Sequence, residues 1–179
     1  MKATKNPQKI LALLLAVPAF AAEPSLTEED YTLRLSNEED APVFALGDEA
    51  DALLAALADH TGAPVAMTFE DQDCMLPGMT REYQTADELF VIATRPLPGD
   101  PNANTIESVM VQTDSVTTHR GARVGMTLTE IEALYGTDHT LDYDTFLYAN
   151  GDFDPQVMFF FDTETWICVG WMLFRNMVI

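Results

Sequence analysis

Residues 124–136 have the sequence VGMTLTEIEALYG. Thr127 is followed three residues later by Glu130, the spacing of a capping box at the start of a helix. Four apolar residues then recur at helical spacing: Leu128, Ile131, Leu134 and Tyr135. Gly136 ends the pattern. The segment therefore predicts a short amphipathic helix between two glycine turns.

A similar pattern occurs in residues 43–58. Gly47 precedes a run of acids, which suit the first turn of a helix because they complement the helix dipole. Apolar residues again recur at helical spacing: Leu53, Leu54 and Leu57. Aligning Gly47 with Gly125 sets the two helices in register at an offset of 78 residues. This alignment indicates an internal duplication.

Strand-like runs follow both predicted helices. They lie at residues 65–69, 81–85, 89–94 and 106–113 after the first helix, and at 141–149, 156–162 and 166–174 after the second. The short connection between the last two runs predicts a hairpin. The expected fold class is α+β, with two tandem helix-on-antiparallel-sheet repeats at residues 43–116 and 117–179.

Residues 1–21 predict a signal peptide. Three lysines and no acid stand at its start: Lys2, Lys5 and Lys9. An apolar run then ends in Ala19-Phe20-Ala21, which places small residues at the two positions that a signal peptidase recognises. The run is too short to cross a bilayer of about 30 Å as a helix. We therefore expect cleavage after Ala21, a secreted or extracytoplasmic chain, and no stable membrane insertion after cleavage.

The chain is strongly acidic, with a formal net charge of −20. Loss of the three lysines of the signal peptide changes this charge to −23. Residues 22–42 form an acidic leader with one possible edge strand at residues 31–35. Nucleic acid phosphates and anionic membrane surfaces repel such a chain, so neither is expected as a partner. A basic partner fits this charge better.

Residues 118–136 carry a resemblance. A threonine, the basic-glycine turn Arg120-Gly121, the step Val124-Gly125 and a helix ending in Tyr135-Gly136 follow one another. This order resembles a recurring sequence motif of uncharacterised exported proteins of anaerobic bacteria. It is also similar to the repeat unit of the β-lactamase inhibitor protein and of the related outer-membrane assembly lipoprotein fold. Residues 43–57 look like a diverged copy of the same motif.

The resemblance covers residues 43–179 and implies a fold without an activity. It implies that the helix-on-sheet repeats join into one continuous curved sheet. In the inhibitor, this surface binds protein. The cysteine pairs usual within the inhibitor's repeats are absent here. Inhibition of a β-lactamase is therefore not implied.

Catalytic motifs are absent from the sequence, which has no nucleophile elbow, phosphate loop, dinucleotide fingerprint or zinc-protease motif. The three histidines are dispersed along the chain: His60, His119 and His139. Cys74 lies in an acidic segment that does not favour a nucleophilic thiol. We predict no catalytic residue and no cofactor. A secreted hydrolase acting on an envelope or extracellular substrate is the alternative.

Oxygen-bearing side chains occur at Asp142, Asp144 and residues 150–154. An EF-hand loop starting at Asp152 would need glycine and glutamate where the chain has Val157 and Thr163. The EF-hand is excluded, and no metal ligands are predicted. An acidic surface protein with a weak cation site remains a third hypothesis.

The last two strand runs, residues 156–162 and 166–174, are apolar at both sets of alternating positions. Both faces of the hairpin are therefore expected to be shielded from water by other residues. Either the chain covers the second face itself, or that face is exposed and binds a partner. The second hypothesis uses aromatic side chains as anchors: Tyr148, Phe160 and Trp171. We expect an exported, non-catalytic protein-binding module with an unidentified protein partner. Whether Cys74 and Cys168 form a disulfide stays open, because the sequence does not give their separation.

Overall fold

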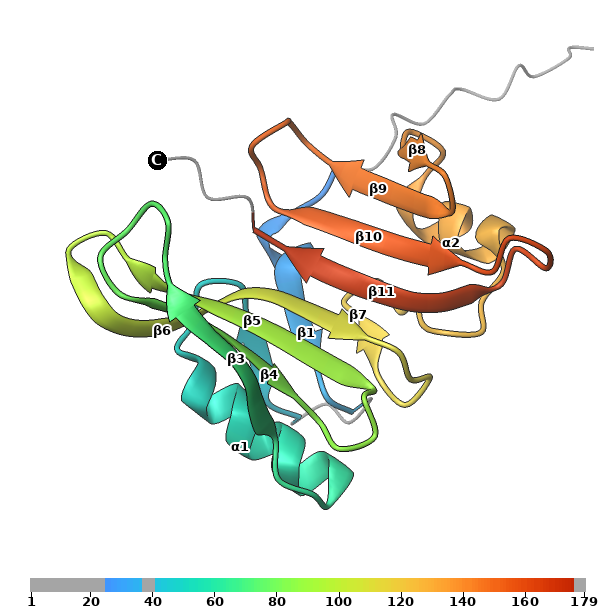
Figure 1. Ribbon diagram of the computed structural model, residues 1–179. Helices are drawn as coiled ribbons and strands as arrows, with labels where there is room; N and C mark the ends of the chain where they lie inside the picture. The colour runs from blue at the N-terminus through green and yellow to red at the C-terminus, as the bar shows by residue number, and fades with distance from the viewer. Residues whose placement is uncertain (1–24, 37–40, 176–179) are drawn as a thin grey trace, which may run out of the picture.

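The computed structural model describes residues 25–36 and 41–175, so the predicted signal peptide lies outside the described residues. The helices are the 3-10 helix η1 (Glu28–Tyr31), α1 (Ala50–Thr61) and α2 (Leu128–Tyr135). The strands are β1 (Thr32–Arg34), β2 (Val43–Ala45), β3 (Ala66–Gln72), β4 (Met79–Gln84), β5 (Phe90–Leu97), β6 (Asp100–Val111), β7 (Thr117–Thr118), β8 (Thr140–Asp142), β9 (Thr145–Ala149), β10 (Gln156–Phe161) and β11 (Cys168–Phe174). Figure 1 shows their arrangement.

Eight of these strands form one antiparallel sheet in the order β3-β4-β5-β6-β11-β10-β9-β8. The long strand β6 lies near its middle, because Ser108–Val111 pair with β5 on one side and with β11 on the other. The described strands at the two edges are β3 and β8. The last two predicted strand runs form the hairpin β10-β11, as expected.

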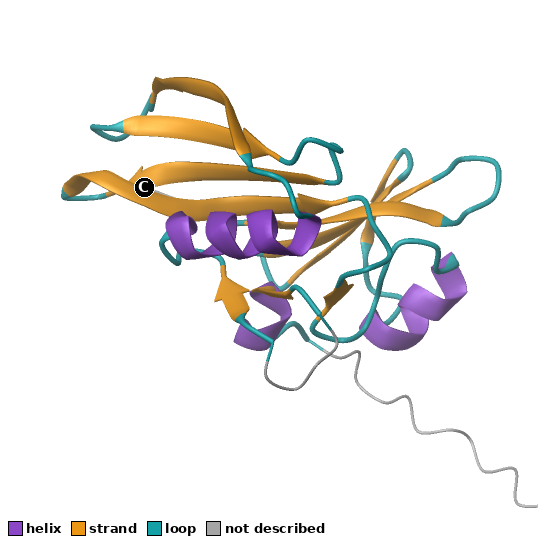
Figure 2. Cartoon of the chain, turned by 90° about the horizontal axis from the view of Figure 1, so that it is seen from below, coloured by secondary structure: helices purple, strands orange, loops and turns teal. Residues whose placement is uncertain are grey.

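A second, three-stranded sheet has the order β2-β1-β7. Its central strand β1 comes from the acidic leader, where an edge strand was expected, and pairs with segments from both halves of the chain. Figure 2 shows both α-helices and this small sheet on the same side of the eight-stranded sheet. The other side of the large sheet carries no described element (Figures 1 and 2).

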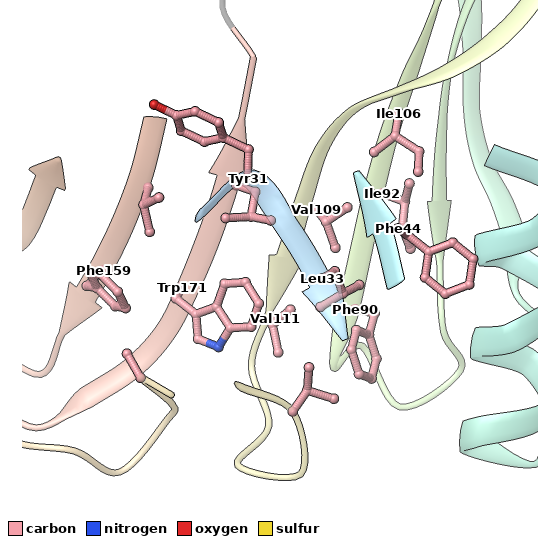
Figure 3. Packing of buried hydrophobic residues seen from close by; sticks show 14 of the residues in the cluster. Tyr31, Leu33, Phe44, Phe90, Ile92, Ile106, Val109, Val111, Phe159 and Trp171 are labelled. Atoms are coloured by element: carbon pink, nitrogen blue, oxygen red, sulfur yellow. The ribbon is translucent and has the colours of Figure 1, made fainter. Parts of the chain in front are cut away.

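A hydrophobic core fills the space between the large sheet and the layer on its covered side (Figure 3). The large sheet contributes Phe90, Ile92, Val109, Val111, Phe159 and Trp171. The opposite layer contributes Leu33 of β1, Leu53 and Leu57 of α1, and Ile131 of α2. Burying one such side chain stabilises the fold by about 1.5–3 kcal/mol.

A buried ion pair fastens the leader to the second half of the chain. The Arg120 guanidinium donates to both carboxylate oxygens of Asp30, at 2.6 and 2.7 Å. The same guanidinium lies 4.9 Å from the centre of the Tyr135 ring. Burial acts to raise the pKa of Asp30, but hydrogen bonds from Arg120 and Thr27 outweigh it, so the pKa lies below its ordinary value.

The predicted capping box of α2 is confirmed. The Thr127 backbone N–H donates to the Glu130 carboxylate at 2.8 Å, and the Glu130 N–H donates to the Thr127 hydroxyl at 3.4 Å. Gly47 and Gly125 both have left-handed φ, at 93° and 90°, which favours glycine at these turns. Neither described α-helix has the length and apolarity that a membrane crossing requires.

The predicted fold class, two tandem helix-on-antiparallel-sheet repeats, is wrong. Strands account for 44% and helices for 16% of the structure, and the described residues contain only two α-helices. One eight-stranded sheet replaces the two layered units. The β6-β11 ladder joins strands assigned to different repeats into this one sheet, so a single, mainly β layer organises the fold. Gly47 and Gly125 lie at similar turns, and an α-helix begins a few residues after each of them.

Candidate functional site

The side of the eight-stranded sheet that faces away from the helices is itself apolar. Along β10, Val157, Phe159 and Phe161 are buried, whereas Met158 and Phe160 are half-buried on the opposite face. Successive side chains of a strand point to opposite faces, so this alternation separates the two sides of the sheet. Because Val157, Phe159 and Phe161 belong to the core, the half-buried set points to the other side of the sheet, which no described element covers.

Five apolar side chains form a row across this uncovered side. Strand register places one on each of five adjacent strands: Val91 on β5, Met110 on β6, Met172 on β11, Met158 on β10 and Leu147 on β9. All five are half-buried. Side chains directly opposite in adjacent strands lie about 4.5–5.5 Å apart at Cβ, so the row forms a continuous surface.

Two aromatic side chains extend the row. Phe160 lies beside Gly170 of β11, where a Cβ atom would come within 3.7 Å of the Phe160 ring. Phe174 lies two residues after Met172 and therefore on the same face. We call the following seven residues the open face: Val91, Met110, Leu147, Met158, Phe160, Met172 and Phe174.

Two of the three predicted binding residues do not lie on the open face. Trp171 is 0% exposed and Tyr148 is 3% exposed, so the prediction that they form an exposed patch is wrong. Trp171 pairs with Phe159 and has the parity of the covered face, where η1, β1 and both α-helices supply the missing cover. Tyr148 packs on Tyr135, with 5.2 Å between ring centres. Phe160 alone of the three belongs to the open face.

The methionines of the open face were not among the predicted site residues. Met158 and Met172 face each other in the β10-β11 hairpin, whereas Met110 comes from β6, much earlier in the chain, and joins them through the pairing of β6 with β11. Their signal in the sequence was a methionine within each of three predicted strands. Sequence reasoning gave preference to aromatic residues and passed over these positions.

A charged cluster lies at the end of the sheet near the β3-β4 loop. Arg95 donates to Asp73 at 2.9 Å and to Glu107 at 3.0 Å. Burial acts to raise the pKa of Asp73, but the backbone N–H groups of Met75 and Leu76 and the Arg95 side chain lower it more. Burial also raises the pKa of Glu107. The cluster fixes the loop that contains Cys74 and is a structural feature.

The two cysteines are apart and free. Cys74 is exposed in the β3-β4 loop, whereas Cys168 is buried at the start of β11. Strands β5 and β6 lie between β4 and β11, and three strand spacings of about 4.8 Å separate β4 from β11 by roughly 14 Å. A disulfide needs Cα atoms within about 7 Å, so Cys74 and Cys168 do not form the disulfide that the sequence left open. Burial raises the pKa of the Cys168 thiol to about 11.

The histidines remain dispersed in the structure. Their nearest polar partners are Ser115 for His60 at 3.3 Å, Glu29 for His119 at 3.0 Å and Glu132 for His139 at 3.2 Å. The structure does not bring any two of them together in these contacts. A catalytic histidine pair therefore finds no support among the described residues.

His139, the partner of Glu132, lines an open hollow of about 260 Å³. The His139 ring packs against Phe146 and Tyr148, with 4.5 and 5.5 Å between ring centres. Its Nδ1 atom is buried without a hydrogen-bond partner among the described residues. Thr140 supplies the one hydroxyl group among the residues that line this hollow. The histidine mainly completes the aromatic cluster.

The acidic segments do not converge. The described residues contain no group of three or more His, Cys, Asp or Glu side chains that could hold a metal ion. Asn150, one of the predicted oxygen donors, instead bonds the leader, accepting from the Leu26 N–H and donating to its carbonyl, both at 2.9 Å. The hypothesis of a cation-binding surface protein gains no support from this part of the chain.

Comparisons with known proteins add no relative. No family model matches the sequence, and neither a curated protein nor a solved structure matches it. The candidate site therefore depends on its own geometry.

Proposed function

We propose that this chain is an exported, non-catalytic protein-binding module that binds a partner protein through the open face. One observation carries the proposal: a row of apolar side chains, three of them methionines, crosses five adjacent strands on a side without described cover. Contiguous exposed apolar patches on soluble domains mark interaction sites. Covering this row would remove its side chains from water.

The residue types of the open face suit a binding surface. Methionine is unbranched and polarizable, so it adapts its shape to different partners and is frequent on such surfaces. Phe160 and Phe174 add rigid apolar area, which contributes strongly when it is desolvated at the centre of an interface. The combination supports recognition by shape and apolar contact.

The charge of the chain supports a basic partner. The formal net charge is −20, and the leader and several loops carry clustered acids. Such a field speeds the encounter with a positively charged protein and repels a second copy of the chain. Association with the partner should therefore slow as salt is added.

Export is part of the proposal and rests on the sequence of residues 1–21. The measurement is the intact mass of the protein recovered outside the cytoplasm. The expected mass is that of Ala22 to Ile179. A mass that still includes residues 1–21 would contradict the predicted cleavage.

Capture experiments test the binding function. The wild type, a Met158→Gln/Met172→Gln double variant and a Met75→Gln control would each be immobilised and exposed to the envelope and medium of the producing organism. Met75 is exposed in the β3-β4 loop and lies outside the open face. We expect the wild type and the control to retain a partner that the double variant loses while its melting temperature stays unchanged. Equal capture by all three would contradict the proposal.

The His139–Glu132 pair beside its hollow favours a hydrolase as the second candidate. A His139→Gln variant separates the two functions. Binding through the open face is expected to survive this change. Hydrolysis of an envelope substrate that disappears in His139→Gln would support the second candidate instead.

A further inference from the structure

Strand β3 forms an edge of the eight-stranded sheet, and no described segment pairs with its outer side. All seven of its residues are exposed. The described strand at the opposite edge, β8, has only three residues. An unpaired edge presents backbone N–H and C=O groups that can hydrogen-bond another extended chain.

Two large apolar side chains stand on β3. Met67 and Phe69 are each 53% exposed, although both are of a type that is usually buried. Met67 pairs with Tyr83 and Phe69 with Glu82, which are neighbours on β4 and point to opposite faces. An added strand would therefore find one apolar contact on each face of the edge.

The edge also carries two acidic side chains, Glu70 and Asp71. Glu70 is neutralised by Arg81 at 2.7 Å. Asp71 has no basic partner among the described residues, and its carboxylate accepts the Gln72 N–H at 2.7 Å. A cationic side chain on an added strand would meet this carboxylate and the negative field of the whole chain.

We propose that β3 binds an extended segment of a partner protein as an additional strand, and that this segment carries lysine or arginine among apolar residues. A second copy of this chain is a poorer occupant, because Asp71 and the net charge of each copy would repel the other. The bulge between Met67 and Phe69 also interrupts the ladder, a common protection against self-pairing of edges.

This proposal is independent of the open face, because β3 contributes none of its seven residues. The probe is a ten-residue peptide of alternating lysine and valine with blocked ends. Two control peptides replace every lysine by glutamate, or place a proline at the centre of the basic peptide. Fluorescence anisotropy would measure binding to the intact secreted chain.

Gln72→Pro is the variant that blocks the edge. The Asp73 N–H donates to Gly78 at 3.0 Å within the β3-β4 hairpin, so the neighbouring Gln72 N–H points away from β4. Proline there removes no hydrogen bond to β4. It removes the outward N–H, together with the local hydrogen bond from this N–H to the Asp71 carboxylate. Asp71→Lys reverses the unpaired charge, and Glu164→Lys makes the same change in charge on the distant β10-β11 turn.

The basic peptide should bind the wild type and the Glu164→Lys control, and the two control peptides should not. Asp71→Lys and Gln72→Pro should each weaken binding about tenfold or more, while Phe160→Ala leaves it unchanged. Binding that resists Gln72→Pro but is lost in Phe160→Ala would overturn the assignment to the edge and leave the open face standing. A dimer of the free chain that Gln72→Pro dissociates would overturn the assignment to a partner.

Discussion

The two faces of the β10-β11 hairpin are similarly apolar but have different surroundings. Phe159 and Trp171 point into the core, whereas Phe160 and Met172 point to the side without described cover. The sequence of the hairpin does not distinguish the two faces, because apolar residues occupy both sets of alternating positions. What separates them is a strand from the acidic leader and two helices, all on one side.

Which face of the hairpin is buried depends on segments far away in the chain. On the covered face, Leu33 of β1 lies more than a hundred residues away in sequence from Trp171. Of the two alternatives that the sequence leaves open for the second face, the described residues show cover on one face of the hairpin and none on the other. Substitutions on the open face therefore test whether this surface binds a partner.

Trp171→Ala should have the largest effect. It removes a fully buried indole from the core, and such a change costs about 3–5 kcal/mol in the free energy of unfolding. Chemical denaturation measures the loss, with Met172→Ala on the opposite face as the control. A Trp171→Ala variant as stable as this control would contradict the assignment of the covered face.

Asp30→Asn should break the attachment of the leader, because Arg120 would keep its charge without the carboxylate. Loss of one partner of a buried pair costs about 3 kcal/mol. The pKa of Asp30 is lower in the folded state, so its contribution is present above about pH 4 and is lost as the pH falls through the folded pKa. Thermal unfolding between pH 7 and pH 3 should therefore show a weaker acid dependence for Asp30→Asn than for the wild type. An identical dependence of thermal stability on pH in both proteins would contradict a stabilising role of the Asp30–Arg120 pair.

Phe160→Ala should cost about 1 kcal/mol or less, since its ring is half-buried on a surface and not enclosed in the core. The same change should reduce partner capture much more than it reduces stability. Thermal unfolding and capture measured on one preparation test this separation. A stability loss as large as that of Trp171→Ala would make the two faces equivalent.

Cys74→Ser should have the smallest effect on stability, within about 0.5 kcal/mol, because its side chain is exposed and free. A thiol reagent should modify Cys74 in the folded protein and reach Cys168 only after unfolding. Mass spectrometry of the labelled chain counts the modified thiols. If neither thiol reacts in the folded protein, Cys74 and Cys168 form a disulfide, which would contradict the structure.

Local features of the fold could be predicted from the sequence. The capping box of Thr127 and Glu130 and the turn at Gly47 depend on neighbouring residues, so local patterns are sufficient to locate α2 and the start of α1. Most of the strands after them were found for the same reason, although the single run expected at residues 141–149 is two strands, β8 and β9. The pairing of β6 with β11 and the insertion of β1 depend on contacts between distant segments, for which one sequence has no signal.

The candidate site was predictable to a smaller extent. The double apolar pattern of the hairpin correctly indicated two apolar faces, and Phe160 was assigned to the face now described as open. Trp171 and Tyr148 were misplaced because the parity that faces the core is fixed by the register and by β1. Met110 could not have been joined to Met158 before the order of the strands was known.

Methionine oxidation in the free protein and in its complex distinguishes binding through the open face from binding elsewhere. Mild peroxide converts accessible methionines to sulfoxides, and peptide mass spectrometry reports each position. With the captured partner bound, Met158 and Met172 should be protected, whereas Met75 should oxidise as fast as in the free chain. Equal oxidation of Met158 and Met172 in the free and bound states would contradict binding through the open face.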